Sequence, residues 1–339
     1  MEPNLKILNF RNLKKLRIFI KNNWKKDHIL AKDKSFLIWQ YHKKKKISTA
    51  AAIFKNKILG IQMYIPQSHF DSRLSNKEIF LTIFRCLETK IPGLSIKIFK
   101  FILKKFKPSF IGTTGFSHRM INFHKWQGFK VGLMNHHVAI SPFKKKFKIA
   151  GVPKRIKKFN YSKESEKYKI IEIKASNINL YKVDRSFYNQ IPKKTLNFIF
   201  NRFLKHPRYS YFIFAVIRNK KIISTCILRM VKKNKISIFK IVDFIGHEKF
   251  FTHYRNVFFK LIKIYAAEYI DFYSYGINEK YILNAGFINR RKYKNLVIPE
   301  YFEPFVKKNI NLMYGYINNT KKKVKIFKAD GDRDRPNKF

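Results

Sequence analysis

Apolar runs separated by short polar turns mark the first part of the chain as a sheet. The runs 47–54 and 58–65 are joined by the polar turn Lys55-Asn56-Lys57, which predicts a β-hairpin. The run 78–87 predicts a further, central strand. Residues 4–24 place apolar side chains on one side and lysines on the other, which predicts two amphipathic helices or one broken helix.

The next stretch predicts helices and strands in alternation. Residues 94–106 are apolar apart from lysines spaced three or four residues apart, as in a helix packed on a sheet. A proline ends this helix, and 109–115 has the Phe, Ile and Thr content of a buried strand. Ser117 is suited to begin a second helix that ends at Gly128, and the apolar run 129–134 predicts another strand.

The second half of the chain repeats this order in outline. The segment 208–231 matches 35–65, with Asn219-Lys220-Lys221 at its turn. The predicted elements that follow are a strand at 235–246, a long helix at 247–269, a strand at 270–277 and a helix ending at Gly286. Such self-similarity is typical of a tandem pair of one fold.

We therefore predict an α/β (α+β) protein of two tandem domains, each a mixed central sheet flanked by helices. The predicted limits are 1–150 and 170–339. Between them, 151–169 continues a stretch rich in Lys, Pro and Ser that reads as a basic linker, either solvated or docked on acidic lipid.

The charge of the chain points to a polyanionic partner, but its distribution weakens that indication. Lys and Arg number 74 against 20 Asp and Glu, a net charge of +54. The lysines are spread over the whole length and accompany abundant Ile, Phe, Asn and Tyr, as an AT-rich genome imposes on any protein. We therefore expect no nucleic-acid partner on this ground, although such a surface attracts acidic membranes, nucleotide sugars and coenzyme A.

The chain carries no sign of export. Its start has an early acid and repeated charges where a secretory signal has an apolar core, and its apolar runs are too short to span a bilayer. Cys86 and Cys226 are far apart and each is alone in an apolar run, so no disulfide framework is predicted. We expect a cytoplasmic protein, with peripheral contact with the inner membrane left open.

The order loop, helix, strand, helix, strand, with KIPGLS at 90–95 and HKWQGF at 124–129, resembles the GNAT superfamily of acyl-CoA N-acyltransferases. In that family a loop of the form Q/R-x-x-G-x-G/A presents backbone N–H groups to the pyrophosphate of coenzyme A, as a helix N-terminus can. The resemblance implies acetyl-CoA or another acyl-CoA as donor substrate. The implied donor-binding residues are Lys90, Gly93, Leu94, Ser95 and Ile96, of which Lys90 and Ser95 depart from the pattern.

The resemblance also gives a role to a histidine. His124 stands four residues before Gly128, where the family often has a Tyr that protonates the departing thiolate. An unperturbed imidazole titrates at about 6.5, so His124 can donate a proton near neutral pH. The alternative is a helix histidine without catalytic duty.

Amide formation also needs a group that takes a proton from the acceptor amine. Glu78 and Glu88 bracket the strand before the loop, and Asp243 ends the corresponding strand of the second half, so these three acids are the candidates. Each can equally be a surface or capping acid. In the second half Gly246-His247-Glu248 replaces the loop and its acid repels phosphate, so that half reads as a degenerate copy that shapes the acceptor site or holds the fold together.

The tail KADGDRDRPN at 328–337, together with IPEYFEPF at 298–305, resembles a group of double-GNAT-like proteins of bacterial surface-polysaccharide biosynthesis. This resemblance implies acyl transfer to a sugar amine. Asp330, Asp332 and Asp334 alternate as in calcium loops but lack the acid that an EF-hand needs, so pairing with arginines or lysines, or contact with sugar hydroxyls, is predicted. The histidines do not have zinc spacing, and no metal is predicted.

Three functions remain open on the sequence. The first is an acyl-CoA-dependent N-acyltransferase acting on an amino sugar or nucleotide sugar in surface glycan biosynthesis. The second is a FemAB-like aminoacyl transferase that uses aminoacyl-tRNA, the one nucleic acid considered. The third is a non-enzymatic binding protein built from a decayed GNAT pair.

Overall fold

The computed structural model describes residues 2–88, 91–163 and 167–336. The chain divides into two compact units, and it changes unit several times. Unit 1 comprises Met1–Val131, Gly315–Thr320 and Gly331–Phe339, and unit 2 comprises Gly132–Tyr314 and Lys321–Asp330. This division differs from the predicted limits of 1–150, 151–169 and 170–339, because the chain enters unit 2 at Gly132 and returns twice to unit 1.

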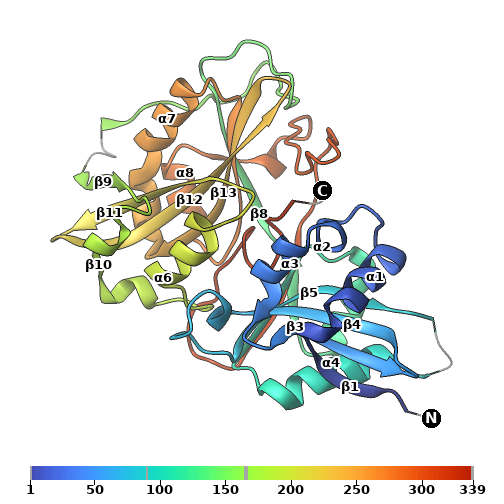
Figure 1. The fold of residues 1–339 in the computed structure, drawn as a ribbon. Helices are drawn as coiled ribbons and strands as arrows, with labels where there is room; N and C mark the ends of the chain where they lie inside the picture. Colours follow the sequence, from blue (N-terminus) through green and yellow to red (C-terminus); the bar gives the residue numbers. More distant parts are fainter. Residues whose placement is uncertain (1, 89–90, 164–166, 337–339) are drawn as a thin grey trace. The chain divides into compact units, whose positions relative to one another are not determined.

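Unit 1 is built on a mixed sheet with the strand order β1-β3-β4-β5-β6-β16-β7 (Figure 1). The strands are β1 (Asn4–Asn9), β3 (Lys46–Phe54), β4 (Lys57–Pro66), β5 (Glu78–Cys86), β6 (Phe110–Thr114), β16 (Met313–Asn318) and β7 (Lys130–Leu133), and β2 (His42–Lys43) pairs with β3. Neighbours are antiparallel from β1 to β5, whereas β5 and β6 run parallel.

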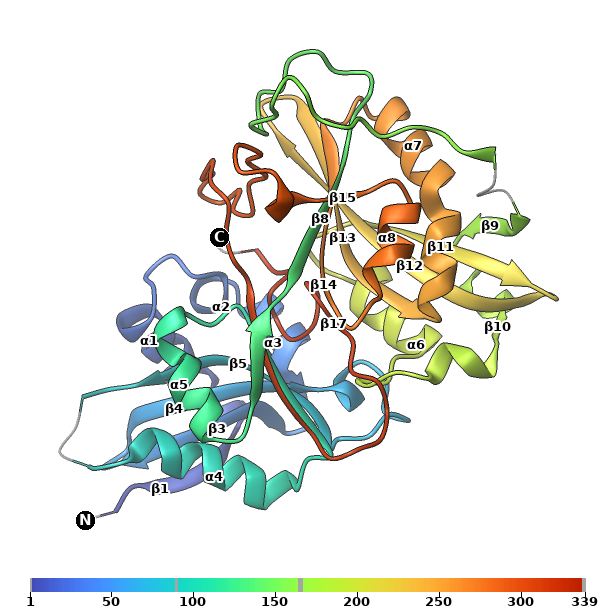
Figure 2. The same cartoon turned by 180° about the vertical axis from the view of Figure 1, so that it is seen from behind.

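Helices cover both faces of this sheet, with α1 and α3 on one face and α4 on the other (Figures 1 and 2). Alternation along β3 explains the arrangement, because Ala50 and Ala52 pack in one apolar cluster with Ile98 and Ile102 of α4, and Ala51 points to the opposite face. The helices are α1 (Leu13–Asn23), α2 (Ile29–Lys32), α3 (Lys34–Tyr41), α4 (Leu94–Phe106) and α5 (Ile121–Trp126).

Two local predictions in unit 1 are wrong. Residues 4–9 form strand β1 rather than the start of a helix, because Leu5 and Ile7 alternate with polar residues and pair with the edge of β3. Residues 35–41, which were matched to a strand of the second half, lie in helix α3. The Asp33 side chain starts this helix by accepting a hydrogen bond of 2.9 Å from the backbone N–H of Phe36.

Unit 2 is built on a second mixed sheet, in the order β15-β8-β14-β13-β12-β11-β9. Its strands are β15 (Ile288–Asn289), β8 (Asn135–Ile140), β14 (Tyr269–Tyr275), β13 (Ile236–Gly246), β12 (Lys221–Lys233), β11 (Tyr211–Arg218) and β9 (Lys169–Glu172), with β10 (Lys182–Val183) and β17 (Ile326–Phe327) paired to β12 and β14. Its helices are α6 (Leu196–Ile199), α7 (Arg255–Ile264) and α8 (Glu279–Asn284). The predicted long helix is split, since Glu248–Tyr254 is a 3₁₀ helix and α7 starts only at Arg255.

The same pairing pattern occurs in both sheets, which confirms the predicted fold class. In unit 1 β3, β4 and β5 are successively antiparallel and β6 is parallel to β5, and β11, β12, β13 and β14 repeat these directions in unit 2. The last strand of each pattern is flanked by a strand from elsewhere in the chain. In unit 1 β16 lies beside β6, and in unit 2 β8 lies beside β14.

The described part of the predicted linker packs on unit 2. Phe159 is 1% exposed in the same cluster as Phe287, and Ile156 lies in a second cluster with Ile298. Residues 148–150, just before the linker, donate hydrogen bonds from their backbone N–H groups to the Glu268 carboxylate. These contacts give this segment a fixed course over the unit.

Candidate functional site

Unit 1 contains a cavity of about 380 Å³ where the parallel strands β5 and β6 separate. Backbone pairing joins 78–81 to 110–113 and stops there. Beyond that point the cavity is lined by 81–84 from β5 and 113–117 from β6 and the loop after it. Its other lining residues are Trp24, Gln62, Ser95, Phe99, Met120, Phe123, His124, Gln127, Asp332, Arg333 and Arg335.

The first turn of α4 borders this cavity and carries backbone donors that no described residue engages. Gly93 stands before the helix with φ of +65°, a left-handed conformation suited to glycine, and it is exposed. The first backbone hydrogen bond of the helix runs from Lys97 N–H to Gly93 O, so the N–H groups of 94–96 have no acceptor within it. Ser95 lines the cavity, and the side chain of Leu94 is buried in the apolar cluster under α4. Ile96 is half-buried, and Lys90 lies outside the described residues.

His124 lies on α5 at the edge of the same cavity, surrounded by aromatic rings. Its ring centroid is 4.5 Å from that of Phe116 and 5.1 Å from that of Phe129, and the residue is 8% exposed. Burial lowers the pKa of His124 to about 4. The ring is therefore neutral at pH 7, and no described residue hydrogen-bonds its buried Nδ1.

The three predicted acids do not line the cavity. Glu88 is exposed after the end of β5, and Glu78 lies at the opposite end of that strand, in register with Phe110 at the start of β6. Asp243 belongs to unit 2 and is 1% exposed. Both of its oxygens accept hydrogen bonds of 2.8 Å from Lys194 Nζ.

The tail supplies cavity residues whose place the sequence did not reveal. Asp332, Arg333 and Arg335 line the cavity, and Arg335 Nε lies 3.0 Å from Asp332 Oδ2. This pair, and the ion pair of 2.8 Å between Lys194 and Asp330, agree with the prediction that the tail acids pair with arginines and lysines. The signal in the sequence was the alternation of acids and arginines, but nothing in it gave their location.

In unit 2 the corresponding gap is filled by the chain itself. β13 and β14 are paired only at 239–241 and 270–272. Beyond these pairs, Ala329 N–H donates to Val242 O at 2.8 Å and β17 pairs with the end of β14. Phe327 is fully buried there, stacked on Phe272 with ring centroids 5.8 Å apart.

The loop after β13 is also covered. Lys325 Nζ donates to Gly246 O at 2.6 Å, and Glu248 pairs with Lys323 at 2.9 Å. Burial lowers the pKa of Lys325 to about 8. The segment 321–330 thus contacts the loop that the sequence predicts to be degenerate. It fills the position in unit 2 that corresponds to the cavity in unit 1.

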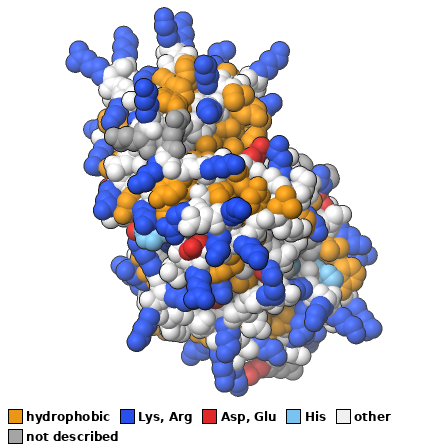
Figure 3. All heavy atoms as spheres, turned by 90° about the vertical axis from the view of Figure 1, so that its left-hand side faces the viewer, with side chains coloured by type: hydrophobic (Ala, Val, Ile, Leu, Met, Phe, Trp, Pro, Cys, Tyr) orange, Lys and Arg blue, Asp and Glu red, His pale blue; other side chains and the backbone are white. Residues whose placement is uncertain are grey.

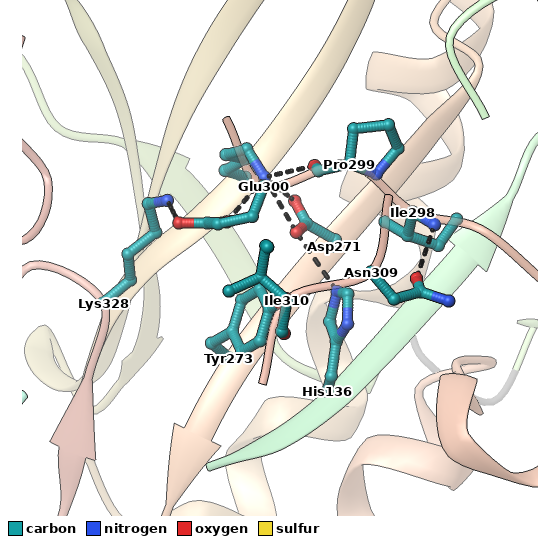
Figure 4. Close-up of polar contacts among 10 residues, drawn as sticks. His136, Asp271, Tyr273, Ile298, Pro299, Glu300, Asn309, Ile310 and Lys328 are labelled. Carbon is teal, nitrogen blue, oxygen red and sulfur yellow. Dashed lines mark hydrogen bonds and ion pairs between the residues drawn. The ribbon is translucent and has the colours of Figure 1, made fainter. Parts of the chain in front are cut away.

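Unit 2 further contains a buried ionic network (Figure 4). Lys240 Nζ lies 2.9 Å from Asp271 and 3.2 Å from Glu300, and Lys328 also pairs with Glu300. His136 Nε2 lies 3.3 Å from Asp271, and burial lowers its pKa to about 4. The two lysines balance the two carboxylates, so each of these four buried charges lies beside an opposite charge.

On the face that Figure 3 shows, basic side chains are dispersed rather than gathered in one patch. Among the residues that the structure describes, no helix combines the length and the apolar composition needed to cross a bilayer. The described residues likewise contain no group of three His, Cys, Asp or Glu side chains arranged to hold a metal ion.

Comparison with known proteins gives similarity in structure only. No protein-family model and no curated protein matches the chain. N-myristoyltransferase from Saccharomyces cerevisiae, solved with bound myristoyl-CoA and inhibitors, is 11% identical with a TM-score of 0.46 over 93% of this chain and 80% of that one. A GCN5-related N-acetyltransferase from Anabaena variabilis is 9% identical with a TM-score of 0.52 over 92% of this chain and 72% of that one. The chain therefore has the fold of a GCN5-related N-acetyltransferase.

Proposed function

We propose that the protein is an acyl-CoA-dependent N-acyltransferase whose donor binds in the cavity of unit 1. One observation carries the proposal: the cavity opens where β5 and β6 separate, directly beside the unused N–H groups at the start of α4. Its volume of about 380 Å³ is in the range of small-molecule sites.

The parts of an acyl-CoA have matching surroundings in this cavity. The first turn of α4 supplies N–H groups and the positive end of a helix dipole for the diphosphate. Past Ser95 the walls become apolar at Phe99 and Leu81, which suits the pantetheine arm and the acyl chain. Beyond the last ladder pair with β6, the edge of β5 that faces the gap can hydrogen-bond the amides of that arm.

The proposed reaction forms an amide bond. The acceptor nitrogen, as a free amine, attacks the thioester carbonyl, the C–S bond breaks, the nitrogen loses one proton and the thiolate gains one. His124 lines the cavity, and we assign it the role of hydrogen-bonding the leaving sulfur. Because its ring is neutral at pH 7, it acts as a hydrogen-bond donor to the sulfur rather than as a stored acid.

We further propose an amino sugar as acceptor, in agreement with the resemblance of the tail to surface-glycan proteins. A FemAB-like reaction remains the second candidate, because the charge of +54 is compatible with a tRNA-borne donor, although its even spread along the chain does not by itself indicate one. The two differ in a simple measurement. Saturating acetyl-CoA raises the melting temperature under our proposal, whereas co-purifying tRNA without any response to acetyl-CoA favours the alternative.

The loop is tested by a matched pair of substitutions at Gly93. Among the described residues, a Cβ at this position meets only Ile96 Cδ1, at 4.0 Å, and Asp and Asn both tolerate a positive φ. Gly93→Asp places a negative charge beside the diphosphate, so we expect coenzyme A affinity to fall at least about tenfold relative to Gly93→Asn, since a like-charge contact costs more than 1.4 kcal/mol. Calorimetric titration measures this ratio, and equal affinities in the two variants would reject the loop as the diphosphate site.

A further inference from the structure

The terminal segment 331–336 forms one wall of the unit 1 cavity. A Cβ at Gly115 would lie 2.7 Å from Arg333 Nε, so the arginine runs directly over this glycine at the end of β6. Asp332, Arg333 and Arg335 bring two positive charges and one negative charge to the cavity. Trp24, which is 47% exposed, adds a broad apolar ring to the same lining.

Asp332 is held in place through one of its two oxygens. Its Oδ2 accepts a hydrogen bond of 3.0 Å from the Tyr41 hydroxyl and lies 3.0 Å from Arg335 Nε. Tyr41 is fully buried and also contacts Thr82 Oγ1 at 3.1 Å. Burial raises the pKa of Tyr41 well above its ordinary value, so this hydroxyl keeps its proton. No described residue hydrogen-bonds Asp332 Oδ1, and the Asp332 side chain is 14% exposed.

The tail lies on the opposite side of the sheet from the start of α4. Leu81 packs in the cluster of α4 with Ile98, whereas the next residue, Thr82, turns to Tyr41 on α3. Gly331 lies beside Thr82 on this second face. Because both Leu81 and Thr82 line the cavity, it extends from one face to the other between the separated strands.

We propose that the segment 331–336 is the acceptor subsite, which binds a phosphorylated amino sugar through Asp332 and Arg333. This inference rests on the proposed function, since it assigns the α4 side of the cavity to the donor. The oxygen Asp332 Oδ1 binds the acceptor's amino group at the point where a thioester carbonyl emerges between β5 and β6. The Arg333 guanidinium binds the phosphate, which it suits better than an ammonium does.

The experiment uses the full chain saturated with desulfo-coenzyme A, a donor analogue that cannot react. Three probes are titrated: glucosamine 6-phosphate, glucose 6-phosphate, which lacks the amine, and glucosamine, which lacks the phosphate. We expect glucosamine 6-phosphate to bind at least about tenfold more tightly than either of the others, because a hydrogen bond to a charged group contributes enough for such a factor.

Substitutions then assign the two preferences to residues. Asp332→Asn should abolish the preference for glucosamine 6-phosphate over glucose 6-phosphate. Arg333→Gln should abolish the preference for glucosamine 6-phosphate over glucosamine. The affinity for desulfo-coenzyme A should be unchanged in both variants. Asp27→Asn and Arg85→Gln remove the same charges from exposed positions of unit 1 and should leave both preferences intact. Tyr41→Phe removes the hydroxyl that holds Asp332 and should weaken glucosamine 6-phosphate binding several-fold, again without effect on the donor analogue.

The outcomes separate this inference from the proposed function. If desulfo-coenzyme A does not bind, both fail. If it binds and the wild-type protein does not prefer glucosamine 6-phosphate, the acceptor subsite is refuted and the donor site stands. A loss of desulfo-coenzyme A affinity in Asp332→Asn, in a variant with an unchanged melting temperature, would place Asp332 in the donor site and also overturn the inference.

Discussion

At the scale of single residues, burial decides what a side chain can do. The sequence suggested that His124 donates a proton near neutral pH, as an exposed imidazole would. Among Phe116, Phe123 and Phe129 the charged form is disfavoured, and the pKa of His124 falls to about 4. Asp243 is also buried, in unit 2, where it lies 2.8 Å from Lys194 Nζ and does not line the cavity of unit 1.

We predict that His124→Phe lowers the acyl-transfer rate about tenfold to a hundredfold, the effect of one lost hydrogen bond to a charged sulfur, with little change in donor affinity. Single-turnover kinetics measure the rate and calorimetry the affinity. The wild-type rate should show no step from His124 between pH 5.5 and 8, a range well above its pKa of about 4. A fall in rate above about pH 6.5 that disappears in His124→Phe would instead identify an imidazolium acid.

At the scale of elements, the two units differ in what fills the gap between their parallel strands. In unit 1 the gap between β5 and β6 is a cavity, whereas in unit 2 the segment 324–330 occupies the gap between β13 and β14. The buried Phe327 and the ion pair of Asp330 with Lys194 fix this segment. A donor in unit 2 would have to displace packed side chains and a β-ladder.

We therefore predict that one acetyl-CoA binds per chain, which calorimetric stoichiometry measures. Phe327→Ala should lower the free energy of unfolding by about 3–5 kcal/mol, the usual cost of truncating a buried phenylalanine. The stoichiometry and affinity for acetyl-CoA should stay as in the wild type at temperatures where this variant is folded. Two equivalent sites in the wild type, or loss of the single site in folded Phe327→Ala, would contradict this assignment.

At the scale of the whole molecule, buried ionisable groups link stability to pH. Burial lowers the pKa of His28 to about 2 and those of His124 and His136 to about 4. Below about pH 6.5 these histidines are protonated in the unfolded chain but stay neutral in the folded one. The free energy of unfolding that they contribute is therefore fully present above pH 6.5 and is lost as the pH falls towards 4. Asp243 acts in the opposite sense, because burial raises its pKa to about 6. As the pH falls, Asp243 is protonated in the folded chain before it is in the unfolded chain, which favours the folded state.

We predict a net loss of about 4–5 kcal/mol in the free energy of unfolding between pH 7 and pH 5. Each of the three histidines contributes about 2 kcal/mol to the loss and Asp243 offsets about 1–2 kcal/mol, at about 1.4 kcal/mol for each unit of pKa difference. Urea unfolding at the two pH values measures it. His136→Gln should reduce the pH dependence by about 2 kcal/mol, and a variant that keeps the full dependence would show that His136 does not cause it.

The sequence by itself determined the elements whose signals are local. Both hairpin turns have their residues at positive φ, at Lys55 and Asn56 and again at Asn219 and Lys220, so the backbone reverses at the predicted positions. Gly128 likewise ends its helix with φ of +86°. The amphipathic pattern of α4 and the apolar runs of the central strands depend on neighbouring residues only, and from them the mixed sheets and the GNAT-like order could be predicted.

Only the tertiary structure decided which distant segments complete each unit. The strand β16 joins the unit 1 sheet beside β6, and the tail at 331–336 lines the cavity of the same unit, although some two hundred residues separate them from its other elements. No local pattern encodes such pairings. A free strand edge or an open cavity wall can be completed by any segment of the chain whose apolar and polar groups find suitable partners there, however distant it is in sequence. The same reason explains why the acids nearest the loop in sequence lie outside the cavity while Asp332 lines it.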